Sequence, residues 1–107
     1  MTKNILSFIK ECVKQERILW TYHVNMRLSQ RSITSFNVIN SIDSFEIIEE
    51  YPDDKYLQSY LIYAKDSDFV FHLVVAVDET NNCITVVTAY KPTLEKWGND
   101  FKTRRRR

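Results

Sequence analysis

The stretch Phe69-Val70-Phe71-His72-Leu73-Val74-Val75-Ala76-Val77 decides the fold of this chain. An apolar run of this length, rich in β-branched and aromatic residues and followed by the polar residues 78–82, predicts a central β-strand. Alternation gives one face the large side chains of Phe69, Phe71, Leu73, Val75 and Val77. We expect this face to pack against helices. His72 should then project from the opposite, more accessible face.

Three other segments have the composition of strands. They are residues 45–51, 60–65 and 84–90, closed by Pro52-Asp53-Asp54, Asp66-Ser67-Asp68 and Pro92. The connections between strands are too short for crossover helices, so the sequence predicts a four-stranded antiparallel meander. After the last strand, residues 93–97 can form one helical turn with Gly98 as its C-cap.

The first part of the chain shows helical spacing instead. Apolar residues recur at Ile5, Leu6, Ile9, Cys12 and Val13, which predicts a helix from about Lys3 to Glu16. Residues that can cap three helices stand at Thr2 or Asn4, at Thr21, and at Thr34 or Ser35. The second helix should run to Arg31, and residues 18–20 form a short apolar link before it. Helices followed by strands predict the α+β class, with a helical N-terminal half packed on the sheet.

Length and composition indicate one ordinary domain. The chain has 107 residues, of which 44% are hydrophobic; we assign residues 1–103 to a single domain and residues 104–107 to a basic tail. No apolar run approaches the ~20 residues of a membrane span. The N-terminus lacks the features of a signal peptide, so we expect a cytoplasmic protein without a membrane partner. Cys12 and Cys83 are expected to be reduced thiols.

The net charge of +1 conceals an uneven distribution. Residues 1–34 hold six basic and two acidic residues, and residues 83–107 hold seven basic and two acidic residues. Residues 35–82 hold two basic and ten acidic residues. If the two ends meet in space they form a basic patch suited to phosphate, whereas a mixed solvated surface is the simpler reading.

The second helix carries the most informative spacing. His23, Arg27 and Arg31 lie four residues apart and therefore share one stripe of the helix. A histidine and two arginines on one stripe can converge on an anion, because guanidinium groups match the geometry of phosphate. The competing reading, favoured by spacing alone, is a solvated face whose arginine stems cover apolar surface.

Three residues of the predicted strands can also carry chemistry. His72 can serve as a general acid or base, or it can be a hydrogen-bonded structural histidine. Thr88 and Tyr90, which alternation places on the same face as Ile84 and Val86, can bind phosphate and stack on a base, or can simply be strand formers.

An acidic group at Glu46, Glu49, Glu50, Asp53 and Asp54 is expected to be solvated, because alternation separates Glu46 and Glu50 from Glu49. No metal-binding motif accompanies it, and no cofactor is expected.

Four blocks of the sequence resemble DUF family 4258. They are His23 to Ile33 (H-x3-R-x3-R-x-I), Glu46 to Pro52, Phe71 to Ala76, and Thr88-Ala89-Tyr90-Lys91-Pro92 followed by Trp97 and Phe101. The resemblance runs from about Trp20 to Arg104. Ser32 stands where the family pattern has glycine, and Ala64 stands where a strand glycine is common.

The resemblance implies a RelE/barnase-like fold and a link to toxin–antitoxin modules, including the MqsR type. It implies a metal-independent endoribonuclease that cleaves RNA through a 2′,3′-cyclic phosphate, with a protein antitoxin as partner. In that scheme His72 and His23 transfer protons, Arg27 and Arg31 stabilise the phosphate charge, and Thr88 and Tyr90 position substrate. The alternative is a non-catalytic RNA- or protein-binding module of the same fold.

Overall fold

Each of the three α-helices in the described residues begins at one of the predicted caps, and a short 3-10 helix, η1 (Ile42–Ser44), follows the third. The computed structural model describes residues 4–52 and 57–104. The Asn4 side chain accepts a hydrogen bond from Ser7 N at the start of α1 (Ile5–Lys14), and Thr21 caps α2 (Tyr22–Gln30) in the same way. Thr34 forms a reciprocal capping box with Asn37 at the start of α3 (Ser35–Asn40). The predicted helices are therefore confirmed.

Within the part of the chain that the structure describes the sheet has five strands, and the prediction of a four-stranded antiparallel sheet is wrong. The strands are β1 (Ile18–Trp20), β2 (Glu46–Tyr51), β3 (Ser59–Asp66), β4 (Phe69–Asp78) and β5 (Cys83–Tyr90), in the order β1-β5-β4-β3-β2. Strands β2 to β5 form the predicted antiparallel meander. Residues 18–20, expected to be a link, pair in parallel with β5 instead. A three-residue strand offers too little alternation to be recognised from sequence.

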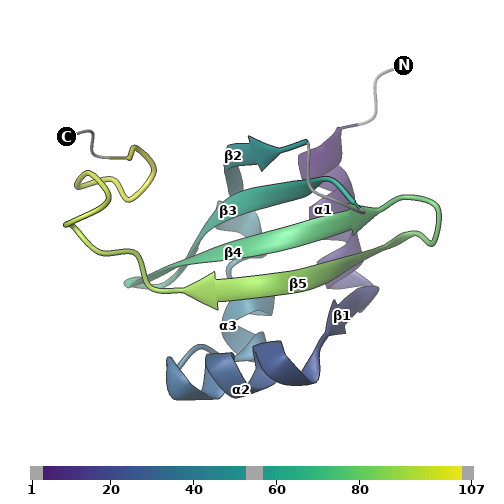
Figure 1. Ribbon diagram of the computed structural model, residues 1–107, viewed down its shortest axis with the longest axis horizontal. Helices are drawn as coiled ribbons and strands as arrows, with labels where there is room; N and C mark the ends of the chain where they lie inside the picture. Colours follow the sequence, from purple (N-terminus) through teal and green to yellow (C-terminus); the bar gives the residue numbers. More distant parts are fainter. Residues whose placement is uncertain (1–3, 53–56, 105–107) are drawn as a thin grey trace.

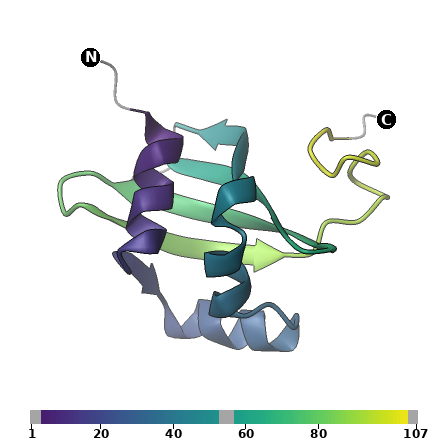
Figure 2. The ribbon, with the colours of Figure 1, turned by 180° about the vertical axis from the view of Figure 1, so that it is seen from behind.

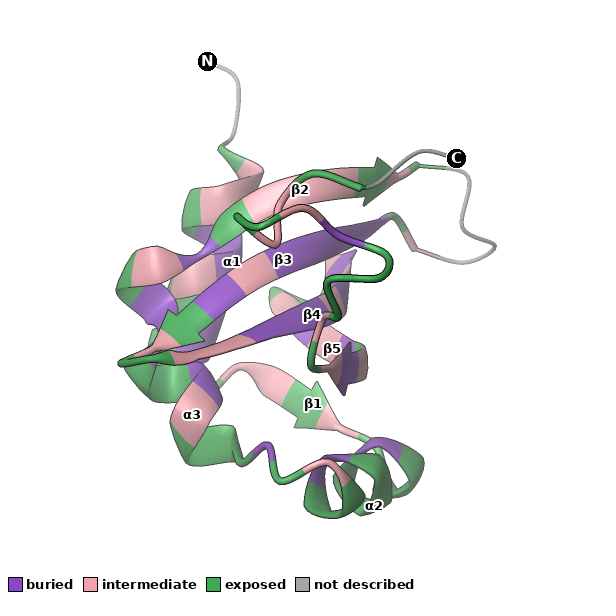
Figure 3. Ribbon diagram, turned by 90° about the vertical axis from the view of Figure 1, so that its left-hand side faces the viewer, coloured by how far each residue is buried: buried purple, intermediate pink, exposed green. Residues whose placement is uncertain are grey.

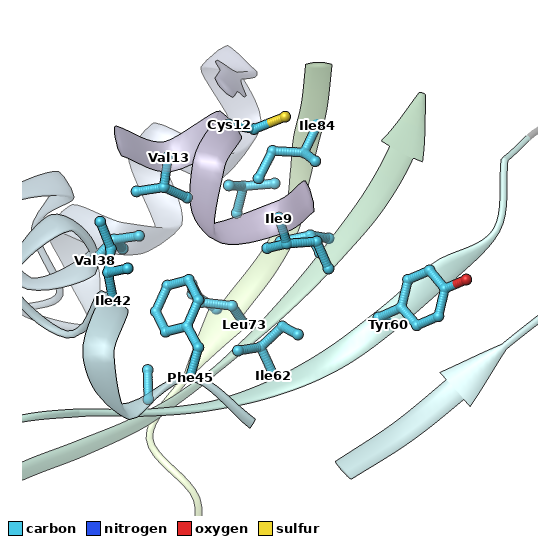
Figure 4. Close-up of a cluster of buried hydrophobic side chains, with 14 of the residues drawn as sticks. Ile9, Cys12, Val13, Val38, Ile42, Phe45, Tyr60, Ile62, Leu73 and Ile84 are labelled. Atoms are coloured by element: carbon cyan, nitrogen blue, oxygen red, sulfur yellow. The ribbon is translucent and has the colours of Figure 1, made fainter. Parts of the chain in front are cut away.

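One face of the sheet packs against α1 and α3, which lie side by side across the strands (Figure 2). The buried core joins α1 residues such as Ile9 and Val13 to Ile62, Leu73 and Ile84 of the sheet (Figure 4). The large side chains of β4 belong to this core, as predicted. Each such side chain stabilises the fold by about 1.5–3 kcal/mol on burial.

The two faces of the sheet are covered differently. Seen edge-on, the helices α1 and α3 lie on one side of β3 and β4, and the chain after β5 lies on the other side (Figure 3). Helix α2 runs below the edge formed by β1 and β5 (Figure 1). Its first turn follows β1, whereas its last turn lies near the end of β5. Among the described residues, no helix is long and apolar enough to cross a membrane.

The backbone conformation of the turn after α2 explains why glycine is common at the position of Ser32 in the pattern that this sequence resembles. Ile33 N donates to Leu28 O and Ser32 N donates to Ser29 O, which is the hydrogen-bond pattern of a Schellman motif. Ser32 has a φ of 58°, in the left-handed region. Glycine adopts this conformation without the steric cost that a Cβ imposes. The tight turn is therefore present in this chain, and serine occupies it under strain.

Replacing Ser32 with glycine should increase the free energy of unfolding by about 0.5–1 kcal/mol, because the left-handed strain is removed. Urea denaturation of the wild type and Ser32→Gly measures this difference. Ser29→Gly is the matched control, since Ser29 lies within α2 and glycine there should destabilise the protein by about 0.5 kcal/mol. Equal effects of the two substitutions would contradict the explanation.

Candidate functional site

The chain after β5 folds back over the sheet. We call residues 91–104 the C-terminal segment. Trp97 N and Lys96 N both donate to Thr93 O, so the predicted single helical turn is present. Gly98 does not have the positive φ expected of a left-handed C-cap. Instead Gly98 N donates to Thr103 O at 2.7 Å, and the segment doubles back so that Trp97 and Arg104 form an antiparallel bridge.

His72 lies beneath this segment, and the expectation that it is accessible is wrong. It does project from the face opposite the helices, but its exposed fraction is 0%. The Trp97 ring stands edge-on to the imidazole, with 4.6 Å between ring centroids. His72 Nε2 lies 2.7 Å from the carbonyl oxygen of Phe101. Alternation predicted the face correctly, but only the folded C-terminal segment determines what covers it.

The hydrogen bonds of His72 define its protonation. A carbonyl oxygen only accepts, so Nε2 carries the proton and Nδ1 of the neutral ring is an acceptor. The Tyr90 hydroxyl, 3.3 Å from Nδ1, is positioned to donate to it. Burial is the largest influence on His72 and lowers its pKa below the ordinary value, while the Phe101 carbonyl acts in the opposite direction. His72 is therefore a neutral imidazole that presents a basic nitrogen to Tyr90.

A β-bulge in β5 places Tyr90 opposite His72. Val75 pairs with Val86, but Val74 pairs with Thr88, so Val87 is an extra residue. The expectation that Thr88 and Tyr90 share a face with Ile84 and Val86 is therefore wrong. Ile84 and Val86 face the core, whereas the bulge turns Thr88 and Tyr90 to the face of His72.

A second bulge, in β2, corrects another expectation. Ile47 pairs with Ile62 and Glu49 pairs with Leu61, so Ile48 is the extra residue. Glu46 and Glu49 consequently point to the same face of the sheet, although simple alternation separates them. Asp53 and Asp54, from the same predicted acidic group, lie outside the described residues.

Glu46 and Glu49 both form ion pairs with the C-terminal segment. Lys102 Nζ lies 2.5 Å from Glu46 Oε2, and Arg104 makes a two-point ion pair with Glu49. The Arg104 guanidinium beside Glu49 lowers the pKa of that carboxyl. Arg104 also stacks over the Trp97 ring. The first residue of the predicted basic tail is thus packed against the domain, and residues 105–107 lie outside the described part.

The Tyr51 hydroxyl extends the same network. It donates to Glu49 Oε1 at 2.6 Å. Burial, together with this bond to Glu49, raises the pKa of Tyr51 to about 12. Glu49 therefore accepts from a tyrosine and an arginine at once, which fixes its orientation on the sheet.

Tyr90 lines two neighbouring clefts. The larger, of about 560 Å³, is lined by Tyr90, Lys91, Pro92, Thr93, Glu95, Lys96, Trp97 and Arg104. The smaller, of about 400 Å³, is lined by Gln30, Arg31, Ser32, Tyr90 and Lys91. Four of these residues are basic and one is acidic, so together the clefts suit an anion. Burial raises the pKa of Tyr90, which keeps its hydroxyl protonated.

The predicted stripe on α2 is only partly joined to these clefts. Arg31 Nη1 donates to Ala89 O at 2.5 Å, which brings Arg31 beside Tyr90. Arg27 Nε donates instead to His23 Nε2 at 3.0 Å on the exposed surface of α2. Neither His23 nor Arg27 lines either cleft. The structure therefore brings Arg31, Tyr90 and His72 together, and it leaves His23 and Arg27 apart from them.

Sequence reasoning did not select Lys91, Lys96 or Trp97 as functional candidates. The only signal was the closing block, where proline and tryptophan follow Tyr90 at fixed spacing. Thr88 lies on the predicted strand but lines neither cleft. No cluster of His, Cys, Asp or Glu among residues 4–52 and 57–104 has the grouping of a metal site.

Comparison with known families adds one finding. The family described as Domain of unknown function (DUF4258) matches residues 20–91, more than half of the chain. The chain belongs to this family. The match includes Arg31, His72 and Tyr90, and it ends before most of the C-terminal segment. No curated protein and no solved structure matches the chain.

The buried imidazole should make stability depend on pH. Because the fold lowers the pKa of His72 from about 6.5, the unfolded chain binds this proton first as the pH falls. The free energy of unfolding should therefore be fully retained above pH 6.5 and decrease below it, down to the pKa of the folded state. Urea denaturation at pH 7.5 and 5.5 measures this decrease.

The variant that tests this prediction removes the buried imidazole. His72→Gln should be less stable than the wild type at pH 7.5 but show a smaller decrease between pH 7.5 and 5.5. The carboxyl of Glu49 affects the pH dependence of the free energy of unfolding only near and below its ordinary pKa of 4.5, which lies outside the range from pH 7.5 to pH 5.5. An unchanged decrease in His72→Gln would contradict the assignment.

Proposed function

We propose that this domain binds RNA in the two clefts around Tyr90 and cleaves it there, as the toxin of a toxin–antitoxin module. The observation that carries the proposal is Tyr90 itself, which lines two basic clefts and whose hydroxyl lies 3.3 Å from His72 Nδ1. The RelE/barnase-like fold, the MqsR-type relationship and the cytoplasmic location belong to the same proposal. The matching family is described only as a domain of unknown function, so the support comes from the residues around Tyr90 and not from the family.

The basic residues around Tyr90 account for binding. Arg31 donates one of its five N–H groups to Ala89 O. This bond fixes the guanidinium in position, and its other N–H groups can donate to a phosphate. Lys91 and Lys96 contribute further positive charge to the rims of the clefts. Phosphate contacts of this kind supply affinity without sequence specificity.

The pair of Tyr90 and His72 accounts for cleavage. The RNA 2′-hydroxyl attacks the adjacent phosphorus, and its proton passes to the Tyr90 oxygen while the Tyr90 proton passes to His72 Nδ1. The bond from phosphorus to the 5′-oxygen breaks, and the leaving oxygen takes a proton from solvent. The product is a 2′,3′-cyclic phosphate. Arg31 stabilises the charge that develops on the phosphate oxygens.

This scheme changes the roles inferred from sequence. Tyr90, expected to position substrate, becomes the group that touches the reacting atoms. His72 acts through Tyr90, because its imidazole is buried and bonded to Phe101 O. His23 and Arg27 have no role in the reaction, since they line neither cleft.

Tyr90→Phe tests the chemistry. Loss of the hydroxyl should reduce RNA cleavage by roughly 10²–10⁴-fold, the usual contribution of a proton-transfer group, and should relieve growth arrest on regulated expression. Affinity for RNA should change little because the ring remains. Tyr63→Phe is the matched control, since the Tyr63 ring flanks His72 from β3 but lines neither cleft. Undiminished cleavage by Tyr90→Phe would exclude the mechanism.

The salt dependence of binding tests the location of the RNA. Removal of one phosphate contact from a single-stranded RNA should reduce the slope of log Kobs against log salt by about 0.7. We expect this change for Lys91→Ala and for Lys96→Ala. Lys14→Ala, in the last turn of α1, should leave the slope unchanged. Fluorescence anisotropy with a labelled oligonucleotide provides the measurement, and equal slopes for all variants would place the RNA elsewhere.

A non-catalytic binding module is the second candidate. It is favoured by the complete burial of His72 and by the two hydrogen bonds that already occupy its ring. This candidate predicts the same salt slopes, but no cleavage by the wild type at any enzyme concentration. Total RNA from expressing cells, examined on a gel for wild type and Tyr90→Phe, separates the two.

A further inference from the structure

The outer surface of α2 carries two large apolar side chains that the described residues leave largely exposed. Tyr22 is 80% exposed and Met26 is 46% exposed. They are four residues apart, so they stand one above the other on the helix. The buried residues Val24 and Leu28 occupy the opposite side of α2. Single exposed apolar residues are common on protein surfaces, so this pair does not by itself indicate a partner.

Charge supplies the second observation. Residues 17–34 contain three arginines and neither aspartate nor glutamate. Arg27 follows Met26 directly, and its Nε donates to His23 Nε2. This hydrogen bond holds the arginine stem along the helix surface, beside the apolar pair. The outer side of α2 is therefore an apolar stripe bordered by positive charge, with no acidic residue in the same segment to neutralise it.

We propose that the α2 face, defined by Tyr22, His23, Met26 and Arg27, binds an acidic amphipathic segment of a partner protein. Apolar side chains of the partner cover Tyr22 and Met26, and its carboxylates pair with Arg27. This combination favours a protein over RNA, because a phosphate backbone would leave the apolar stripe exposed to water. The inference goes beyond the RNA site, since none of these four residues lines the clefts.

The position of the face also suggests a consequence. Helix α2 rises about 1.5 Å per residue, so Arg31 lies only about 7–8 Å along the axis from Met26. A bound segment longer than α2 would reach Arg31 at the smaller cleft. The same partner could then hinder RNA binding without touching Tyr90.

A synthetic peptide tests the proposal directly. The probe is an amphipathic helical peptide with leucine at helical spacing and glutamate elsewhere, and its matched control has lysine in place of glutamate. NMR spectra of the isotope-labelled 107-residue chain should show shifts in α2 with the acidic peptide only. Affinity should fall at least tenfold in the double variant Tyr22→Ser/Met26→Ser and in Arg27→Glu, as expected when anchor residues are lost.

The control variant is Phe36→Ser, which removes an exposed apolar side chain from α3 and should bind the acidic peptide normally. Absence of binding, equal binding of the lysine peptide, or shifts outside α2 would overturn the proposal. Shifts of α2 with oligouridine but not with the peptide would assign this face to RNA. A dimer in sedimentation that Tyr22→Ser/Met26→Ser abolishes would assign it to a second copy of this chain. None of these measurements involves RNA cleavage, so failure of this proposal can be distinguished from failure of the proposed function.

Discussion

The hydrogen bond from His72 Nε2 to the Phe101 carbonyl joins the central strand to the C-terminal segment, and the arrangement of the site depends on it. It fixes the proton on Nε2, so that Nδ1 can only accept. It also buries the imidazole, which lowers the pKa of His72. The consequence for Tyr90 is direct, because its hydroxyl faces a neutral basic nitrogen and not a second donor.

Two bulges shift the register of the sheet and turn polar side chains toward the face of His72. Without the extra residue Val87, Tyr90 would point toward the helices and its hydroxyl would not face His72 Nδ1. Without the extra residue Ile48, Glu49 would point away from Arg104. Each bulge leaves one residue without a regular partner in the neighbouring strand, and it turns a polar side chain to the other face of the sheet. This is the usual effect of a bulge beside a site.

The C-terminal segment is held mainly by its tryptophan. The ion pairs of Lys102 and Arg104 involve partly exposed groups, and exposed pairs contribute about 1 kcal/mol or less each. Trp97 is 2% exposed, and truncation of a buried tryptophan costs about 3–5 kcal/mol. The segment is therefore part of the packed domain, although the family match ends at residue 91. Lys91 and Lys96 of this segment then supply much of the positive charge around Tyr90.

Sequence alone determined the helices, the meander from β2 to β5, the core face of β4, and the identity of Arg31, His72 and Tyr90 as candidates. These features follow from local periodicity, capping chemistry and residue type, which act over a few neighbouring residues. Tertiary structure decided the parallel pairing of β1, the two bulges, the burial of His72 and the separation of His23 from it. Each of these depends on contacts between segments distant in the chain, such as His72 with Phe101. A single inserted residue in a strand reverses the faces beyond it, and alternation in one sequence does not reveal where that residue lies.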